Sequence, residues 1–351
     1  MRILMVSEGG FVKNPFVPSL ADGLIRCGHE IAFGLDRFWD SFDAYDLLYF
    51  QWPEAIFDWR REGIDLNRLS SHFNRIKDSG VRTVITCHNL HPHNNDTKTM
   101  ALYDLVYSNV DAFHHMGRYS YGLFRDKYPD SIHFIAPHHV ADSFWTKTVS
   151  SHEAKRALKI PMDSVVVSSF GEFRNSEEVW LFVKMAKDVF SRDTSFLAPR
   201  IPRGSCPNSF NLGKALKLLL RNLVYKSLRI RPSGFLSDDE LRVWLSASDV
   251  VFIQRKEILN SGNLPLAYAA GKVVVGPDRG NVGEILKKTG NYVFEPNDRT
   301  SVRQSVLDAI GEIRNGNRLG ALNEKYAKDN WAAARVCGLI DKELSMIVTS
   351  R

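Results

Sequence analysis

Short apolar runs rich in β-branched residues recur along the whole chain, and longer amphipathic stretches separate them. In the first half the runs are RILMVS, EIAFGL, LLYFQW, RTVITC, DAFHHM and HFIAP, and in the second half they are VVVSSFG, TSFLAP, SLRIRPS, DVVFIQ, KVVVGP and NYVFEP. Such alternation is typical of βα units and parallel sheets. About a dozen strands fit two sheets of about six strands better than one. The sequence therefore predicts an α/β protein with two doubly wound domains.

The length of the chain and one polar stretch indicate where the domains divide. At 351 residues the chain exceeds the size of about 250 to 300 residues at which one hydrophobic core stops growing. A polar stretch near residues 140–164 precedes a new strand, so we expect domains over residues 1–150 and 151–330. Residues 323–350 read as one helix, whose last part, residues 331–351, packs back toward the first domain. Its predicted apolar face comprises Trp331, Ala334, Val336, Leu339 and Ile340.

Composition narrows the class of protein. No apolar run approaches the roughly 18 to 20 residues of a membrane span, and the first residues, MRILMVS, fit a strand better than a signal peptide. The cysteines form no CxxC pair, which suggests neither a zinc site nor a disulfide framework. They are Cys27, Cys87, Cys206 and Cys337. We therefore expect a cytoplasmic protein.

Charge is distributed unevenly between the two halves. Residues 1–145 carry 14 Lys and Arg against 18 Asp and Glu, a net −4, whereas residues 146–351 carry 32 against 22, a net +10. A cationic second half suits an anionic ligand or an anionic membrane surface. Residues 214–231 predict a basic amphipathic helix that either lies on anionic lipid or covers a sheet as a solvated helix, and both interpretations stay open. Its cations are Lys214, Lys217, Arg221, Lys226, Arg229 and Arg231.

The stretch ILNSGNLPLAYAAGKVVVGP, residues 258–277, predicts a turn, a short helix and a buried strand. Pro265 fits the first turn of the helix, and Gly271 fits the position after its end. Amides at a helix N-terminus favour an anion, so the stretch is a candidate phosphate site. An ordinary connection between secondary-structure elements is the alternative. The turn-forming residues are Asn260, Ser261, Gly262 and Asn263.

A second candidate site follows the predicted strand RTVITC. The loop HNLHPHNND contains His88, His91, His93 and Asp96, and imidazoles with a carboxylate suit zinc or iron. The spacing lacks the i, i+4 pair of a helical metal site, so we expect no metal here. Hydrogen bonding of a hydroxylated substrate by His88 is the competing role. A structural role for His91 and His93 stays open.

Trp52 and Glu54 directly follow another predicted strand of the first half. An aromatic ring beside a carboxylate suits the apolar face and the hydroxyls of a sugar, although simple packing explains a tryptophan equally well. Glu54 and Asp96 are the candidate general bases.

The segment SSFGEFRNSEE follows the first predicted strand of the second half. Gly171 permits a close backbone approach, and Arg174 offers a forked, permanently charged donor to a diphosphate. Glu177 and Glu178 would repel a diphosphate unless they point away, and a surface pair between Arg174 and Glu177 is the alternative. Lys256, just before the stretch 258–277, supplies a second cation.

In this order the segments resemble the GT-B nucleotide-sugar glycosyltransferases, in particular the family-four-like bacterial enzymes of polysaccharide assembly. The resemblance spans nearly the whole chain. In the first half it rests on FQWPE, TCHNLHPHN and FIAPHHV, which are similar to the HWPE, TxHNxxPH and xIPHG segments of that group. In the second half it rests on FGEFR, GFLSDDEL, SASDVVFIQ, FEPND and residues 256–285.

The resemblance implies two Rossmann-like domains that face each other across a cleft, with the acceptor on the first, the nucleotide-sugar on the second, and a C-terminal helix that crosses back. It also implies that His88 contacts the sugar and that Arg174 meets the donor diphosphate. The implied donor-binding group comprises Gly171, Arg174, Lys256, Asn260, Ser261, Gly262 and Asn263. No DxD-like motif is well placed, so we expect neither a metal nor another cofactor.

The chain departs from this family at the donor loop. Many relatives carry two glutamates with seven residues between them, where this chain has Ile258 and Leu266. Glu257 lies one place out of register, and Glu177 stands where relatives usually have a lysine. The sequence NSG is similar to the TSG of a subgroup that also lacks the glutamate pair, so activity is not excluded.

We therefore expect a glycosyltransferase that moves a sugar from a UDP- or GDP-sugar to a glycan or lipid-linked oligosaccharide, with retention of anomeric configuration. Inversion would need Asp96 or Glu54 as the base. A catalytically silent scaffold subunit and a nucleotide-sugar epimerase are the alternatives, and an NAD oxidoreductase is disfavoured because no GxGxxG follows the first strand. We expect peripheral association with an anionic membrane, at the inner face of the plasma membrane, and no nucleic-acid partner.

Overall fold

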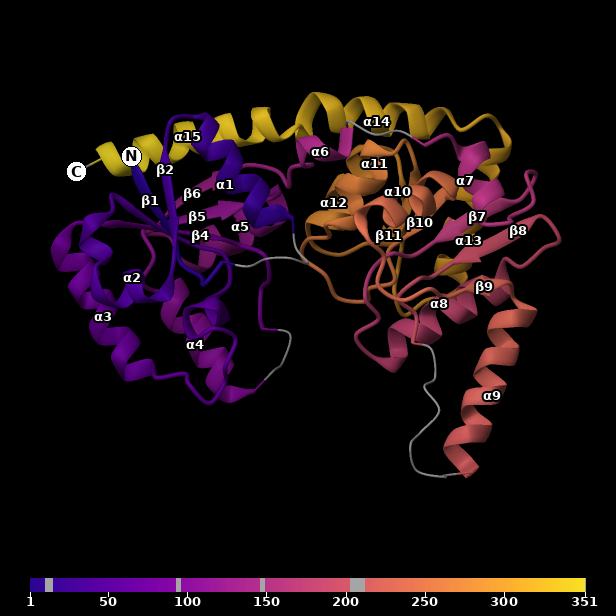
Figure 1. Cartoon of the computed structure of the whole chain (residues 1–351), viewed down its shortest axis with the longest axis horizontal. Coiled ribbons are helices and arrows are strands. Elements are labelled where there is room, and N and C mark those ends of the chain that lie inside the picture. Colours follow the sequence, from indigo (N-terminus) through magenta and orange to yellow (C-terminus); the bar gives the residue numbers. More distant parts are fainter. Residues whose placement is uncertain (10–14, 93–95, 146–148, 203–211, 351) are drawn as a thin grey trace. The chain divides into compact units, whose positions relative to one another are not determined.

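The protein is described here by a computed structural model that separates into two compact units (Figure 1). Unit 1 comprises Met1–Phe144 and Asn330–Arg351, and unit 2 comprises Trp145–Asp329. The structure describes residues 1–9, 15–92, 96–145, 149–202 and 212–350, with the backbone alone for residues 145 and 212–218.

A parallel sheet of six strands, in the order β2-β1-β3-β4-β5-β6, forms the centre of unit 1. Alternate residues of its strands enter two separate hydrophobic cores, as Leu47 and Leu48 of β3 do. Burial on both faces explains why the sequence shows continuous apolar runs. The strands are β1 (Arg2–Met5), β2 (Glu30–Phe33), β3 (Leu47–Phe50), β4 (Arg82–Thr86), β5 (Ala112–His115) and β6 (Ile132–Ile135).

Helices cover both faces of this sheet. One core contains side chains of α1 and α15, and the other contains side chains of α2, α3, α4 and α5. Gly23 of α1 is needed where the two helices α1 and α15 meet, because a Cβ there would collide with Sγ of Cys337. The helices of the first segment are α1 (Phe16–Arg26), α2 (Leu35–Asp40), η1 (Phe42–Ala44), η2 (Pro53–Phe57), α3 (Leu66–Ser79), α4 (Thr97–Tyr107), α5 (Arg118–Lys127) and α6 (Asp142–Trp145).

Unit 2 repeats this plan with a parallel sheet in the order β12-β11-β10-β7-β8-β9. Its larger core lies between the sheet and side chains of α8, α9 and α13, and a smaller core lies between the sheet, α7 and α10. The strands are β7 (Val165–Ser168), β8 (Thr194–Leu197), β9 (Ile230–Arg231), β10 (Val250–Phe252), β11 (Val273–Pro277) and β12 (Tyr292–Phe294). The helices are α7 (Ser151–Ala157), α8 (Ser176–Asp188), α9 (Leu212–Ser227), α10 (Asp238–Ala247), α11 (Asn263–Ala269), α12 (Gly280–Lys288) and α13 (Arg299–Arg314).

The end of the chain is two helices, α14 (Arg318–Trp331) and α15 (Ala333–Thr349), and not the single helix expected. Ala332 between them is extended, at φ −59° and ψ 134°, and it forms a bridge to Val140. The break restarts the helical phase, so the predicted apolar face is partly wrong: Ala334 and Leu339 are exposed. The buried face of α15 comprises Ala333, Val336, Cys337, Ile340, Leu344 and Ile347.

The predicted fold class is confirmed. Each of the twelve apolar runs of the sequence overlaps a strand, and the strands form two six-stranded parallel sheets with flanking helices. Within the described ranges, no helix combines the length and the apolar character that crossing a bilayer requires.

Candidate functional site

The stretch 258–277 lies in unit 2 and folds as its sequence predicts. α11 begins after Gly262 and has Pro265 in its first turn. Gly271, at φ +66°, follows the end of the helix and donates its N–H to the carbonyl of Tyr268 at 2.9 Å. The chain then enters β11. The turn, the short helix and the strand are therefore confirmed.

The loop before α11 rests on the start of α12. Asn281 donates its backbone N–H to the carbonyl of Leu259 at 2.9 Å and its side-chain amide to Oδ1 of Asn260 at 2.8 Å. Gly280 has φ +58°, and a Cβ at this position would collide with the carbonyl oxygen of Ile258. Asn260 and Gly280 thus fix the backbone path of the loop.

Gly171 follows β7, whose neighbour in the sheet is β10. A Cβ on Gly171 would lie 2.8 Å from Nε2 of Gln254 and 3.2 Å from Nδ2 of Asn263. The side-chain amides of Gln254 and Asn263 therefore occupy the space that the absent Cβ of Gly171 leaves open. Gln254 is held in place because its Oε1 accepts from the hydroxyl of Ser169 at 2.6 Å and its Nε2 donates to the carbonyl of Glu172 at 3.2 Å.

Three cationic residues and two glutamates lie near these strand ends. The cationic residues are Arg174, Arg255 and Lys256. Glu178, almost fully buried, pairs with Arg255 and accepts from the backbone N–H of Arg174 at 2.8 Å. Glu177 is exposed and pairs with Lys256 at 3.3 Å. The glutamates therefore pair with Arg255 and Lys256, whereas a pair between Arg174 and Glu177 was the alternative expected from the sequence.

The side chain of Arg174 is exposed, yet its surroundings are crowded with positive charge. Partial desolvation and then the nearby Arg255 lower the pKa of Arg174, while Glu178 and Glu172 act in the opposite direction. A guanidinium remains charged in any case. Arg174 is therefore an exposed guanidinium near the strand ends of unit 2, and a guanidinium offers forked donors to an anion.

In unit 1, His88 lies after β4 and meets residues that follow β3. Its Nε2 lies 2.9 Å from Oε1 of Gln51, and its ring stacks on Trp52 with 4.1 Å between centroids and 17° between planes. Phe16 contacts the imidazole edge-on at 5.1 Å. Since Oε1 accepts, Nε2 carries the proton in the neutral tautomer. Nε2 of Gln51 is buried and has no hydrogen-bond partner among the described residues.

His88 is neutral at physiological pH. Burial, followed by the nearby His138 and His114, holds the pKa of His88 well below its usual value of 6.5. A neutral imidazole donates one hydrogen bond and accepts another, which suits a hydroxyl group. The expected position of His88 at a strand end is thus observed, with Trp52 against it.

Glu54 lies in η2, and both its oxygens accept from the hydroxyl of Tyr103, at 3.1 and 3.0 Å. Burial raises the pKa of Glu54. The hydrogen bond from Tyr103 favours the carboxylate form and acts against this increase. A partly buried carboxylate with a raised pKa is a better proton acceptor at neutral pH than an ordinary one.

Asp96 is the N-cap of α4, a role that the sequence analysis did not assign to it. Its Oδ1 accepts from the backbone N–H of Thr99 at 2.9 Å and its Oδ2 from the Thr99 hydroxyl at 2.7 Å. These bonds lower the pKa of Asp96 and make it the weaker base of the two candidates. His91 is exposed, whereas His93 lies outside the described residues. No group of three or more His, Cys, Asp or Glu suited to a metal occurs in the described part of the chain.

The sequence analysis missed Gln51, Gln254 and Arg255, although each lies within two residues of one that it selected. Each also directly follows a strand, Gln51 after β3 and the other two within three residues of β10. Position at the carboxyl end of a strand was the available signal. Their partners lie after a neighbouring strand that is distant in the sequence, and only the sheet order brings them together.

Solved structures match the whole chain, whereas no protein-family model and no curated protein matches the sequence. Sucrose-phosphate synthase from Thermosynechococcus elongatus is 13% identical with a TM-score of 0.76, and the match covers 100% of both chains. HepE from Anabaena, in complex with UDP, is 12% identical with a TM-score of 0.73, over 98% of this chain and 100% of HepE. A Listeria monocytogenes protein described as a UDP-N-acetylglucosamine 2-epimerase is 11% identical with a TM-score of 0.61, over 98% and 96%.

At these identities the similarity establishes the fold. The two parallel sheets, their strand order and the return of the chain to unit 1 agree with the resemblance that the sequence motifs indicate. The chain therefore has the two-domain GT-B fold.

Proposed function

We propose that the protein is a glycosyltransferase that moves one sugar from a UDP- or GDP-sugar to a glycan or a lipid-linked oligosaccharide in polysaccharide biosynthesis. The observation that carries this proposal is the cationic group of Arg174, Arg255 and Lys256 at the carboxyl ends of β7 and β10. Ligands of doubly wound sheets bind at such strand ends. HepE, which shares the fold, was solved with UDP and with UDP-glucose, which supports a uridine donor.

Cationic side chains near the diphosphate would assist the departure of the leaving group. When the bond between sugar and diphosphate breaks, negative charge develops on the leaving phosphate oxygen. Arg174 and Lys256 stabilise that charge, and the backbone N–H groups of Ser261, Gly262 and Asn263 offer further donors. These groups supply the charge that a metal supplies in other enzymes, so we propose a reaction without a metal or another cofactor.

The strand ends of unit 1 suit the neutral part of the substrates. The indole of Trp52 offers a flat apolar surface, and His88 and Gln51 offer hydrogen bonds to hydroxyl groups. We propose that His88 contacts the transferred sugar and that the reaction retains anomeric configuration. If the reaction inverts, Glu54 is the better base, because its pKa is raised whereas that of Asp96 is lowered.

We further propose that the protein works in the cytoplasm, on the inner face of the plasma membrane. A lipid-linked acceptor places the reaction at that surface. The net charge of +6 favours an anionic membrane, and no nucleic acid is needed as a partner.

Nucleotide-sugar binding and turnover test the proposal. A thermal-shift panel of UDP, GDP and their sugars should show stabilisation by one base, and slow release of UDP or GDP should follow. Arg174→Ala should lower the release rate about 100-fold, the size expected for loss of a donor to developing charge. Arg318→Ala, at an exposed arginine on α14, is the matched control and should leave the rate unchanged.

Two alternatives have their own support. A catalytically silent subunit is favoured by Ile258 and Leu266 at the positions of the usual glutamates, and it would show no release with any donor. An epimerase is favoured by the similarity to the Listeria protein. It would convert a nucleotide-sugar into an isomer without an acceptor, which chromatography of the donor would detect.

A further inference from the structure

Helix α9 carries an apolar surface that the rest of unit 2 leaves uncovered. Its residues are exposed by 40 to 57%, and they are Leu219, Leu220, Leu223 and Val224. At 100° per residue these positions lie on one side of the helix, opposite Tyr225, which enters the core of unit 2. α9 joins the edge strand β9 and projects away from the sheet (Figure 1). A continuous set of large exposed apolar side chains marks an interaction surface.

The sequence segment that contains this apolar surface is strongly cationic. Residues 194–237 contain no Asp or Glu and eight Lys and Arg. Around the helix, Arg221 lies beside one border of the apolar surface and Lys226 beside the other. Arg229 and Arg231 follow at β9. An apolar stripe with a cation at each border is typical of a helix that lies in the interface of an anionic membrane.

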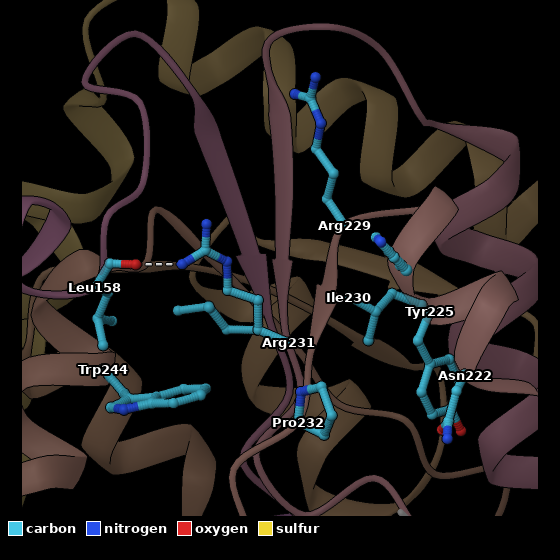
Figure 2. A pocket seen from close by; sticks show the side chains of 10 residues that line it. Leu158, Asn222, Tyr225, Arg229, Ile230, Arg231, Pro232 and Trp244 are labelled. Carbon is cyan, nitrogen blue, oxygen red and sulfur yellow. Dashed lines mark hydrogen bonds between the residues drawn. The ribbon is translucent and has the colours of Figure 1, made fainter.

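A pocket of about 770 Å³ adjoins the same helix. Figure 2 shows Trp244 and Leu158 on one side of it, Tyr225 and Asn222 on the other, and β9 between them. None of the described residues that line it is acidic, whereas Lys226, Arg229 and Arg231 are cationic.

The two arginines of this pocket keep their charge. Arg229 donates to the carbonyl of Arg192 at 2.7 Å, and Arg231 donates to the carbonyls of Leu158 and Lys159. Backbone carbonyls carry no formal charge, and a guanidinium has five N–H donors. The hydroxyl of Tyr225 is buried and has no hydrogen-bond partner within the described ranges. The pocket therefore offers positive charge and donors to a phosphate.

We propose that α9 docks unit 2 onto an anionic lipid bilayer, with its apolar surface in the membrane interface and Lys226, at one border of that surface, beside the headgroup phosphates. A soluble polyanion would match the cations but would leave the leucines in water. A second copy of the chain would bring like charges together. This inference rests on the proposed function, because a lipid-linked acceptor would bring the protein to a membrane. Docking itself can be measured without sugar transfer.

Vesicle flotation of the full-length protein tests the inference. We expect binding to vesicles of equimolar phosphatidylcholine and phosphatidylglycerol and little binding to phosphatidylcholine alone. The double variant Leu220→Ser, Leu223→Ser should partition about tenfold more weakly, and Lys226→Gln about fivefold more weakly. Trp180→Ser and Lys187→Gln, at exposed positions on α8, are the matched controls and should bind as the wild type does.

The following vesicle-binding results would overturn the inference. Equal binding to both vesicle types, or unchanged binding by the double variant, would remove the role of α9. Loss of vesicle binding in millimolar inorganic phosphate would assign the cations of α9 and β9 to a free anion. A wild-type dimer that the double variant dissociates, without vesicle binding, would make the apolar surface a contact between copies. An unchanged midpoint of thermal unfolding shows that the double variant is folded, and absent turnover with intact docking would count against the proposed function alone.

Discussion

The strand ends of the two units carry different chemistry on the same architecture. In unit 1, Gln51 and His88 meet after the neighbouring strands β3 and β4, and the groups are neutral. In unit 2, Glu178 and Arg255 meet beside the neighbouring strands β7 and β10, and the groups are charged. Ten of the eleven histidines lie in unit 1. The paired groups at the strand ends are thus neutral in unit 1 and charged in unit 2.

Low pH should destabilise unit 1 more than unit 2, and this is the largest difference that we expect between the units. Burial lowers the pKa of His114 and His138 to about 4 and of His115 and His139 to about 3. The folded state then binds fewer protons than the unfolded state, so this stability is complete above pH 6.5 and is lost as the pH falls toward the folded values. Each shift corresponds to roughly 3 to 5 kcal/mol.

Hydrogen exchange measured by mass spectrometry at a series of pH values resolves the two units. After correction for intrinsic rates, the strands of unit 1 should lose protection at a higher pH than those of unit 2. His152→Ala, at the histidine of unit 2, should leave both profiles unchanged. Simultaneous loss of protection in both units would contradict the comparison.

Glu178→Gln should produce the next largest effect, on the stability of unit 2. The substitution leaves Arg255, which is 8% exposed, as a buried charge without its partner. Breaking a buried pair in this way costs about 3 to 5 kcal/mol. Urea unfolding measures the change in the free energy of unfolding. Glu177→Gln removes an exposed pair and should cost less than about 1 kcal/mol, and equal losses would show that burial of the pair is unimportant.

His88→Phe should lower turnover about tenfold and leave the affinity for UDP unchanged. Phenylalanine preserves the stack on Trp52 but removes the hydrogen bond of the imidazole, a loss of roughly 1 to 1.5 kcal/mol. The nucleotide is proposed to bind unit 2, so its affinity is independent of this side chain. Steady-state kinetics and calorimetry with UDP separate the two quantities. A parallel loss of UDP affinity would contradict the division of labour between the units.

Lys256→Met should have the smallest effect, a decrease of about three- to fivefold in UDP affinity. The ammonium group is partly exposed and already paired with Glu177, so water and salt screen its attraction for a phosphate. Calorimetry at low and high salt should show the decrease mainly at low salt. Lys325→Met on α14, an exposed lysine paired with Asp329, is the control. If Lys256→Met lowered the affinity for UDP as much as Arg174→Ala does, Lys256 would be the main diphosphate contact.

The sequence alone predicted the two parallel sheets and the loop, helix and strand over residues 258–277. Strands buried on both faces need continuous apolar runs, and such runs can be read without knowing which strands pair. Turn formers and Pro265 act within a few residues, so their effect is also local. The position of His88 at a strand end followed from the same pattern.

Tertiary structure alone decided how the functional groups are paired. Glu178 and Arg255, like Gln51 and His88, are distant in the sequence, and they meet because the sheet order places their strands side by side. The break at Ala332 likewise depends on its bridge to Val140, a long-range contact that no local pattern encodes. Propensity and burial pattern act along the chain, whereas charge pairing, ring stacking and pKa shifts depend on neighbours in space.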